Sequence, residues 1–172
     1  MRCYRLTLLV GSFFLPLVAA AQVGIYANFS AAQLNVGDSN WVYGPTVGAY
    51  YDALHFGVGS AGLDFRAQLF NNNSTATLDS GLAGIRVAVH PPVFPVKPYI
   101  EGLAGVGHAD FSASGAATSA TRFEYAFLGG VDYTLLPHVD WRVAEFSYGG
   151  ISAFGGSFNP KILSTGIVLR LW

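Results

Sequence analysis

Large apolar residues alternate with small or charged residues along the segment 122–133. Side chains of a β-strand point to opposite faces with a period of two, so this pattern predicts a strand with two unlike faces. One face carries Phe123, Tyr125, Phe127, Val131 and Tyr133, and the other carries Arg122, Glu124, Ala126, Gly130 and Asp132. An aromatic face opposite a charged, small face is typical of a membrane-barrel strand, whose rings contact lipid while its ions face a narrow polar interior.

The same alternation recurs along the chain and predicts eight strands. We place them at residues 22–34, 41–51, 55–67, 78–89, 96–108, 122–133, 139–148 and 161–172. The alternation slips twice, and a β-bulge near residues 60–62 and another near Ala144 would restore it. The connections after the second, fourth and sixth strands, at 52–54, 90–95 and 134–138, are short or stiffened by proline, whereas the others are longer and polar. The predicted fold class is therefore all-β: an eight-stranded antiparallel up-and-down transmembrane β-barrel.

The first 21 residues have the features of a secretory signal peptide. Arg2 and Arg5 precede an apolar run at residues 6–18, and three alanines end at Ala21. This arrangement predicts cleavage after Ala21. The predicted domains are a cleaved signal peptide at 1–21 and an outer-membrane barrel at 22–172, and the predicted location is the bacterial cell outer membrane.

The composition is that of a chain that contacts lipid. Hydrophobic residues make up 52% of the chain and charged residues only 11%, against roughly 25% charged residues in an ordinary soluble protein. Beyond residue 21 the chain has seven basic and ten acidic residues, a net charge of −3, which argues against a nucleic-acid partner. Its only cysteine, Cys3, lies in the signal peptide, so no disulfide is expected.

A secreted soluble barrel of the lipocalin type would also alternate, with its apolar side inward. The membrane barrel is favoured because the strand charges are few and of both signs, and because the residues that share their face are mostly small. The opposite face carries aromatic residues near strand ends, where an interfacial girdle would lie: Trp41, Tyr43, Tyr51, Tyr133 and Trp141. The soluble ligand-binding barrel stays as an alternative.

Ten charged residues share the inward face of the predicted strands. They are Asp64, Arg66, Arg86, Glu101, Arg122, Glu124, Asp132, Asp140, Arg142 and Arg170. Charges of opposite sign on neighbouring strands can pair inside a barrel, which offsets the cost of removing them from water. We expect a structural ionic network that plugs the lumen and fixes the strand register. The alternative is a narrow ion or small-solute channel in which these pairs exchange partners, but so narrow an interior favours the plug.

The strand rhythm, the signal peptide and two segments, Lys97-Pro98-Tyr99-Ile100-Glu101 and Gly129-Gly130-Val131-Asp132-Tyr133, resemble the small outer-membrane β-barrels related to the OmpA transmembrane domain and OmpX. The resemblance implies a monomer in outer-membrane lipid, inserted by the barrel-assembly machinery, with a structural role or an extracellular ligand bound through its loops. Family members often end in a lipid-facing phenylalanine. This chain ends in Trp172, which shares parity with Arg170, so Leu171 would be the last outward residue.

Catalytic, metal-binding and cofactor-binding residues are not expected. One family of lipid-modifying outer-membrane enzymes uses a His-x-Ser pair, whereas the four histidines here are followed two residues later by Gly57, Pro92, Asp110 and Asp140. No metal-ligand spacing or phosphate-binding loop is present in the sequence. The sequence therefore predicts a protein that is not an enzyme and has no cofactor, with a lipid-modifying enzyme kept as an alternative.

Overall fold

The computed structural model describes residues 22–34, 40–72, 76–113, 116–153 and 156–171, which form nine strands. The strands are β1 (Gln22–Leu34), β2 (Asn40–Phe56), β3 (Gly59–Asn72), β4 (Ala76–Val89), β5 (Val96–Ala113), β6 (Ala116–Leu136), β7 (Val139–Ala153), β8 (Gly156–Phe158) and β9 (Lys161–Arg170). The described residues contain no helix long and apolar enough to cross a membrane. The predicted signal peptide and Trp172 lie outside the described residues.

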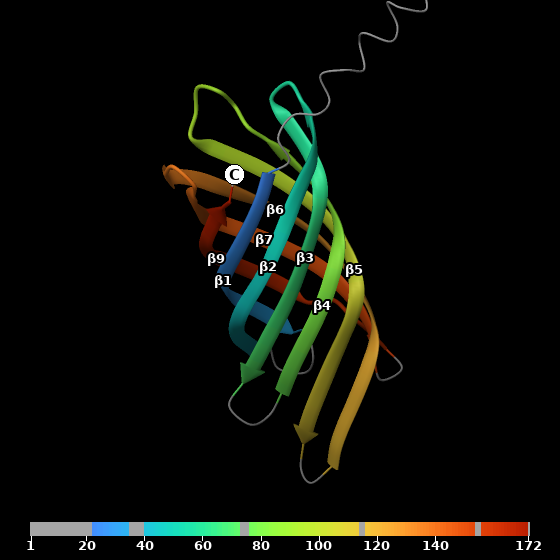
Figure 1. Cartoon of the computed structure of the whole chain (residues 1–172). Helices are drawn as coiled ribbons and strands as arrows, with labels where there is room; N and C mark the ends of the chain where they lie inside the picture. Colours follow the sequence, from blue (N-terminus) through green and yellow to red (C-terminus); the bar gives the residue numbers. More distant parts are fainter. Residues whose placement is uncertain (1–21, 35–39, 73–75, 114–115, 154–155, 172) are drawn as a thin grey trace, which may run out of the picture.

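The strands form one closed antiparallel barrel (Figure 1). Each of β1 to β7 pairs with the next strand in the chain, and β9 closes the sheet by pairing with both β7 and β1. The three-residue β8 pairs with β7 and is separated from β9 by Asn159 and Pro160, so the two share the eighth position in the wall. Closure leaves no sheet edge along the barrel wall, which is what a sheet in lipid requires. The predicted eight-stranded barrel is confirmed.

The two ends of the barrel differ in the length of their connections. We call the end where β1 begins and β9 ends the terminal end; there, tight turns join β2 to β3 and β6 to β7 (Figure 1). We call the opposite end the hairpin end. The β5–β6 hairpin projects farthest from it, because these strands pair continuously from Val96 with Tyr133 to Ala113 with Ala116.

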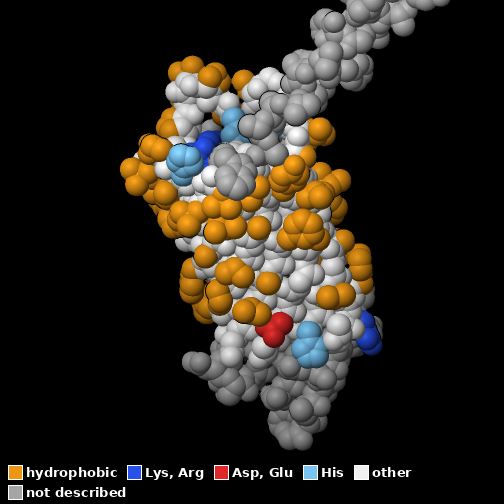
Figure 2. Space-filling model, in the orientation of Figure 1, with side chains coloured by type: hydrophobic (Ala, Val, Ile, Leu, Met, Phe, Trp, Pro, Cys, Tyr) orange, Lys and Arg blue, Asp and Glu red, His pale blue; other side chains and the backbone are white. Residues whose placement is uncertain are grey.

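The outer wall is apolar, as the alternation predicts. Hydrophobic side chains cover it in Figure 2, and charged side chains appear on that view only toward the two ends. Phe29, Phe65, Ile100 and Phe127 are each more than half exposed in the absence of lipid. The predicted girdle residues Trp41, Tyr43, Tyr51, Tyr133 and Trp141 also face outward and are exposed. A wall of this kind is stable only when hydrocarbon surrounds it.

The predicted third strand and its bulge are wrong in detail. The turn lies at Gly57 and Val58, and Gly57 has a φ of 61°, in the left-handed region that glycine adopts without strain. β2 therefore ends at residue 56 and β3 begins at residue 59. The change in the alternation of apolar residues that predicted a bulge is caused by this turn. The irregularity in pairing lies on β2, between Asp52 and Leu54, and β3 pairs with β4 without interruption.

The second predicted bulge is confirmed. The register of β7 against β9 shifts between Arg142 and Glu145. Val143 and Ala144 are both exposed, while the residues on either side of them are buried. The bulge thus turns Glu145 toward the interior, although the plain alternation would have sent it into lipid.

The segment 109–121, predicted as a soft loop, is mostly strand. β5 continues to Ala113 and β6 starts at Ala116. Serine, threonine, alanine and glycine dominate this stretch and give no apolar alternation to detect. The ladder continues because backbone pairing does not require large side chains.

A charge placed on the outer wall is expected to destabilise the barrel. Phe65→Arg, halfway along β3, would put a guanidinium into hydrocarbon at a cost of about 2–4 kcal/mol. The control Val93→Arg lies in the turn between β4 and β5, where the side chain is 80% exposed, and should change the unfolding free energy little. Urea unfolding in lipid vesicles measures both. Equal stability of the two variants would contradict a lipid-facing position for Phe65.

Candidate functional site in the barrel lumen

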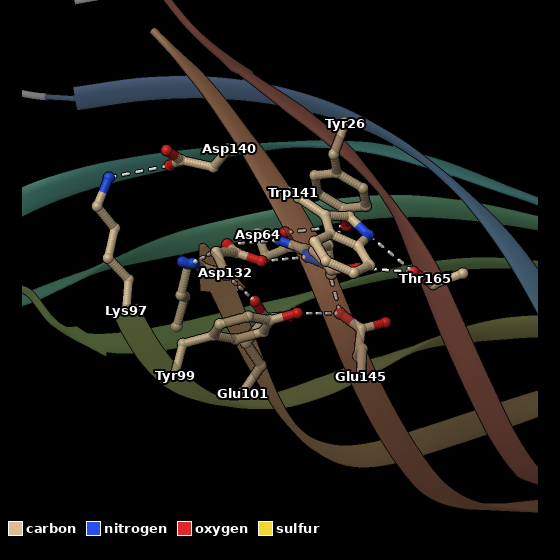
Figure 3. Close-up of polar contacts among 12 residues, drawn as sticks. Tyr26, Asp64, Lys97, Tyr99, Glu101, Asp132, Asp140, Trp141, Glu145 and Thr165 are labelled. Carbon is tan, nitrogen blue, oxygen red and sulfur yellow. Dashed lines mark hydrogen bonds and ion pairs between the residues drawn. The ribbon is translucent and has the colours of Figure 1, made fainter. Parts of the chain in front are cut away.

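Three buried arginines from three strands occupy the lumen. Arg66 on β3, Arg86 on β4 and Arg142 on β7 are at most 4% exposed. Together with Asp64, Glu101, Asp132 and Glu145 they make up what we call the arginine cluster (Figure 3). The formal charge of the cluster is three positive against four negative.

Arg66 contacts carboxylates from three different strands. Its Nε lies 3.1 Å from Asp64 Oδ1, its Nη2 2.6 Å from Glu101 Oε2 and its Nη1 2.8 Å from Glu145 Oε1. These groups belong to β3, β5 and β7. One guanidinium therefore spans the lumen and links opposite parts of the wall.

Arg86 and Arg142 share the remaining carboxylates. Arg142 binds Asp132 Oδ1 through Nε at 2.9 Å and Glu145 Oε2 through Nη1 at 3.1 Å. Arg86 binds Glu101 through Nη1 at 2.5 Å and approaches Asp132 through Nη2 at 3.4 Å. Each of Glu101, Asp132 and Glu145 thus bridges two arginines, so the pairs form a single connected network.

Three inward tyrosines enclose this network. Tyr26 donates to Asp64 at 2.8 Å and Tyr99 donates to Glu145 at 2.7 Å (Figure 3). The guanidinium of Arg86 lies 4.3 Å from the ring centre of Tyr50 and 4.0 Å from that of Tyr99. Arg142 lies between Tyr26 and Tyr99 in the same way, at 4.3 and 4.7 Å. Cation–π contacts of this kind stabilise a desolvated guanidinium more than an exposed one.

A second, smaller group of charges lies at the terminal end. Lys97 Nζ and Arg170 Nε both lie close to Asp140 Oδ2, at 2.9 and 3.0 Å. Both cationic side chains remain partly exposed, at 14% and 19%. In the nearby turn, partial burial lowers the pKa of His90, and the positive charge of Lys97 lowers it further. This end of the lumen is therefore partly open to solvent, and its two cations share the carboxylate of Asp140.

The hairpin end of the lumen contains buried apolar side chains. Six buried residues from β1, β2, β3, β4, β7 and β9 pack together there, and we call them the apolar layer: Ala32, Val42, Phe70, Leu78, Ile151 and Ile162. Between this layer and the arginine cluster lie neutral polar contacts, in which the Ser30 hydroxyl meets those of Thr46 and Ser164 at 2.8 and 2.7 Å. The interior is thus apolar at one end, although the pattern predicted small or polar residues there.

Comparison with known proteins agrees with this architecture. The model of the outer membrane protein beta-barrel domain family matches residues 6–170. The chain belongs to this family. A search of curated proteins found no sequence that matches the chain.

Solved structures share the fold of this outer-membrane β-barrel protein. Neisserial surface protein A superposes with a TM-score of 0.59 at 20% identity, covering 88% of this chain and 97% of that one. The N-terminal β-barrel domain of Pseudomonas aeruginosa OprF gives 0.52 at 14% identity, with 87% and 100% covered. Ail of Yersinia pestis in complex with the heparin analogue sucrose octasulfate gives 0.53 at 16%, with 88% and 97% covered. Identities this low show a shared fold.

The structure distributes the ten charged residues predicted to line the lumen over several places. Six belong to the arginine cluster: Asp64, Arg66, Arg86, Glu101, Asp132 and Arg142. Asp140 and Arg170 pair at the terminal end. Glu124 is buried apart from the cluster, where it accepts from the Ser80 hydroxyl. Arg122 is exposed and donates to the carbonyl of Thr121 at 2.9 Å.

Several members of the two ionic groups were not predicted. Lys97 and Tyr99 share the strand parity of Glu101, so parity alone could have found them. The bulge near Ala144 was the available signal for Glu145. Asp52, expected in a connection, is buried near the end of β2, where it accepts from Ser60 at 3.1 Å and its Oδ1 lies 3.9 Å from Arg86 Nε. Among the described residues, no group of three metal-ligating side chains comes together.

Removal of one arginine from the cluster is expected to destabilise the barrel strongly. Arg66→Met leaves three buried carboxylates without their shared counter-charge, which should cost about 3–5 kcal/mol. Arg122→Met removes an exposed arginine and should change stability by about 0.5 kcal/mol or less. Urea unfolding in vesicles, followed by tryptophan fluorescence, measures both. A loss below 1 kcal/mol for Arg66→Met would show that the cluster does not hold the barrel together.

Proposed function

We propose that this outer-membrane barrel is closed to solutes and presents its β5–β6 hairpin to partners outside the cell. The observation that carries the first part is the arginine cluster, which with its tyrosines occupies the lumen nearer the terminal end. The apolar layer occupies part of the lumen at the hairpin end. Side chains normally fill the interior of an eight-stranded barrel.

The arginine cluster is a structural plug in this proposal. Each arginine of the cluster has at least two carboxylate partners, and two of the carboxylates, Asp64 and Glu145, also accept hydrogen bonds from tyrosines. An ion that entered the cluster would have to displace several desolvated contacts at once. The alternative of a narrow channel needs these partners to exchange.

The proposed interaction surface is the projecting part of the β5–β6 hairpin. β6 begins at Ala116, but its pairing with β7 begins only at Glu124. Among the described strands, residues 116–123 therefore pair with β5 alone and leave one backbone edge open. Arg122 is the only charged residue in that stretch, which contains no proline. An open edge of this kind can bind an extended segment of another protein as an added strand.

We place the hairpin end outside the cell because small outer-membrane barrels have short periplasmic turns and keep both termini in the periplasm. The Ail complex shows that a barrel of similar fold binds a sulfated sugar analogue. Cleavage after Ala21, insertion by the barrel-assembly machinery, the monomeric state and the lack of enzymatic activity stay predictions.

Planar-bilayer recordings test closure. The purified protein should give no current steps, and Phe70→Ala should also stay silent because the arginine cluster still blocks the lumen. A general porin in the same bilayers serves as the positive control, and a gel shift between unheated and boiled samples shows that each variant is folded. Stepwise currents from the unaltered protein would reject the plug.

Bacterial adhesion tests the hairpin. Cells that express the protein should adhere to cultured epithelial cells, and replacement of residues 110–119 by a two-residue turn should lower adhesion several-fold. An equal shortening of the β3–β4 hairpin, which projects less, is the matched control and should leave adhesion near the original level. If both shortenings have the same effect, the β6 edge is not the interaction surface.

A further inference from the structure

Glu124 is a buried carboxylate without a counter-charge. The residue is 1% exposed, and it lies on the inward face of β6. Its only hydrogen bond among the described residues comes from the Ser80 hydroxyl, which donates to Oε2 at 2.5 Å. No arginine, lysine or histidine of the described chain lies within ion-pair distance of it. Every carboxylate of the arginine cluster, in contrast, touches at least one arginine.

Oxygen atoms with unused acceptor capacity lie at Ser80, which contacts this carboxylate, and on the strand beside Ser80. Gln68 lies directly across from Ser80 in the β3–β4 register, is 2% exposed, and its Oε1 has no hydrogen-bond partner. Ser80 uses its single proton on Glu124, so the lone pairs of its oxygen stay available. Two acceptors, the unpartnered Gln68 Oε1 and the Ser80 oxygen, therefore accompany an unpaired carboxylate, and such a group of buried acceptors can hold a positive ion.

Gly107 makes room for this arrangement. It lies on β5 between Ser80 and β6, and a Cβ added at this position would come within 2.5 Å of Glu124 Oε2. Any larger residue would push the carboxylate away from Ser80. The glycine therefore holds open the space in which the carboxylate and the hydroxyl meet.

A bare carboxylate buried among neutral groups is strongly unfavourable, so it needs either a proton or a cation. We infer that Glu124, Gln68 and Ser80 form a lumenal site for one monovalent metal cation such as Na⁺ or K⁺. A single negative charge surrounded by neutral amide and hydroxyl oxygens balances one positive charge, and carboxylate, carbonyl and water oxygens are the ligands that hard cations prefer. A site with one carboxylate also leaves no spacing motif in the sequence.

The apolar layer takes its residues from six strands and contains none from β5 or β6, so the site can be reached from the hairpin end along β6. Arg122 lies two residues from Glu124 on the same face of β6 and is exposed, so solvent comes within one inward position of the carboxylate. On the other side the arginine cluster closes the lumen. The site is therefore a pocket for an external ion rather than a passage, and its existence does not depend on what the hairpin binds.

Anomalous diffraction from crystals of the mature protein soaked in a thallium(I) salt tests the inference directly. Tl⁺ replaces monovalent cations and should give a peak between Glu124 and Gln68. Glu124→Gln, which keeps the shape and removes the charge, should abolish that peak. Asp79→Asn, which removes one acidic charge from the outer wall, should keep it. The absence of a peak in the unaltered protein at saturating Tl⁺ would overturn the inference.

Thermal unfolding in NaCl and in choline chloride of equal ionic strength gives a second measurement. Na⁺ should raise the Tm of the unaltered protein and of Asp79→Asn, and this increment should vanish in Glu124→Gln. Gly107→Ala, which displaces the carboxylate, should reduce the increment while the barrel stays folded. An infrared carbonyl band of a protonated carboxylic acid that persists in NaCl and disappears in Glu124→Gln would overturn the inference, because the proton would then be the neutralising group.

Arg122→Gln separates a bound metal ion from an internal counter-ion. If a metal ion neutralises Glu124, removal of the nearby positive charge should preserve or enlarge the Na⁺-dependent rise in Tm. If Arg122 instead turns inward and pairs with Glu124 in solution, Arg122→Gln should lower the Tm in both salts. The size of that shift should then equal the size of the shift that Glu124→Gln produces. That second outcome would overturn the inference.

Discussion

The interior of this barrel depends on the contacts between three desolvated guanidinium groups and the carboxylates that neutralise them. Lipid surrounds the outer wall, so burial of apolar surface against water does not hold the strands together as it does in a soluble core. The backbone ladder closes the sheet, and the arginine cluster ties its inner face across the lumen. Because Arg66 reaches carboxylates on β3, β5 and β7, a change in the register of any of these strands would leave a charge unpaired in a medium where that is costly.

The chemical character of the other layers of the interior follows from how close each layer lies to water. At the terminal end Lys97 and Arg170 stay partly exposed, and solvent screens the repulsion between these two cations that share Asp140. The hairpin end contains the apolar layer of Phe70 and its neighbours. Neutral hydroxyls and amides lie between these regions, and Glu124 is the exception among them, since it brings a charge into a layer without arginine.

The eight-strand architecture was predictable from the sequence because strand parity survives in every segment that faces lipid on one side. The same rule located most of the inward charges. Parity failed where local geometry overrides it. The turn at Gly57 changes the alternation in the same way as a bulge would. The bulge before Glu145 turns this carboxylate to the face opposite to the one that alternation predicts. The pairing partners of the inward charges could not be predicted from the sequence, for a different reason. Whether Glu124 meets an arginine or a serine depends on stagger between strands, which alternation along one strand does not encode.

The inward charges also bear on the chain before it becomes a barrel. An exported strand of this composition crosses an aqueous compartment with its aromatic face uncovered, where such segments tend to associate. Arg66, Arg86, Glu101, Asp132 and Arg142 interrupt those segments with hydrated charges, and like gatekeeper residues they oppose aggregation. In the folded barrel the same groups are removed from water and contact one another instead. The residues of the arginine cluster therefore help to keep the unfolded chain soluble, although they are buried in the folded barrel.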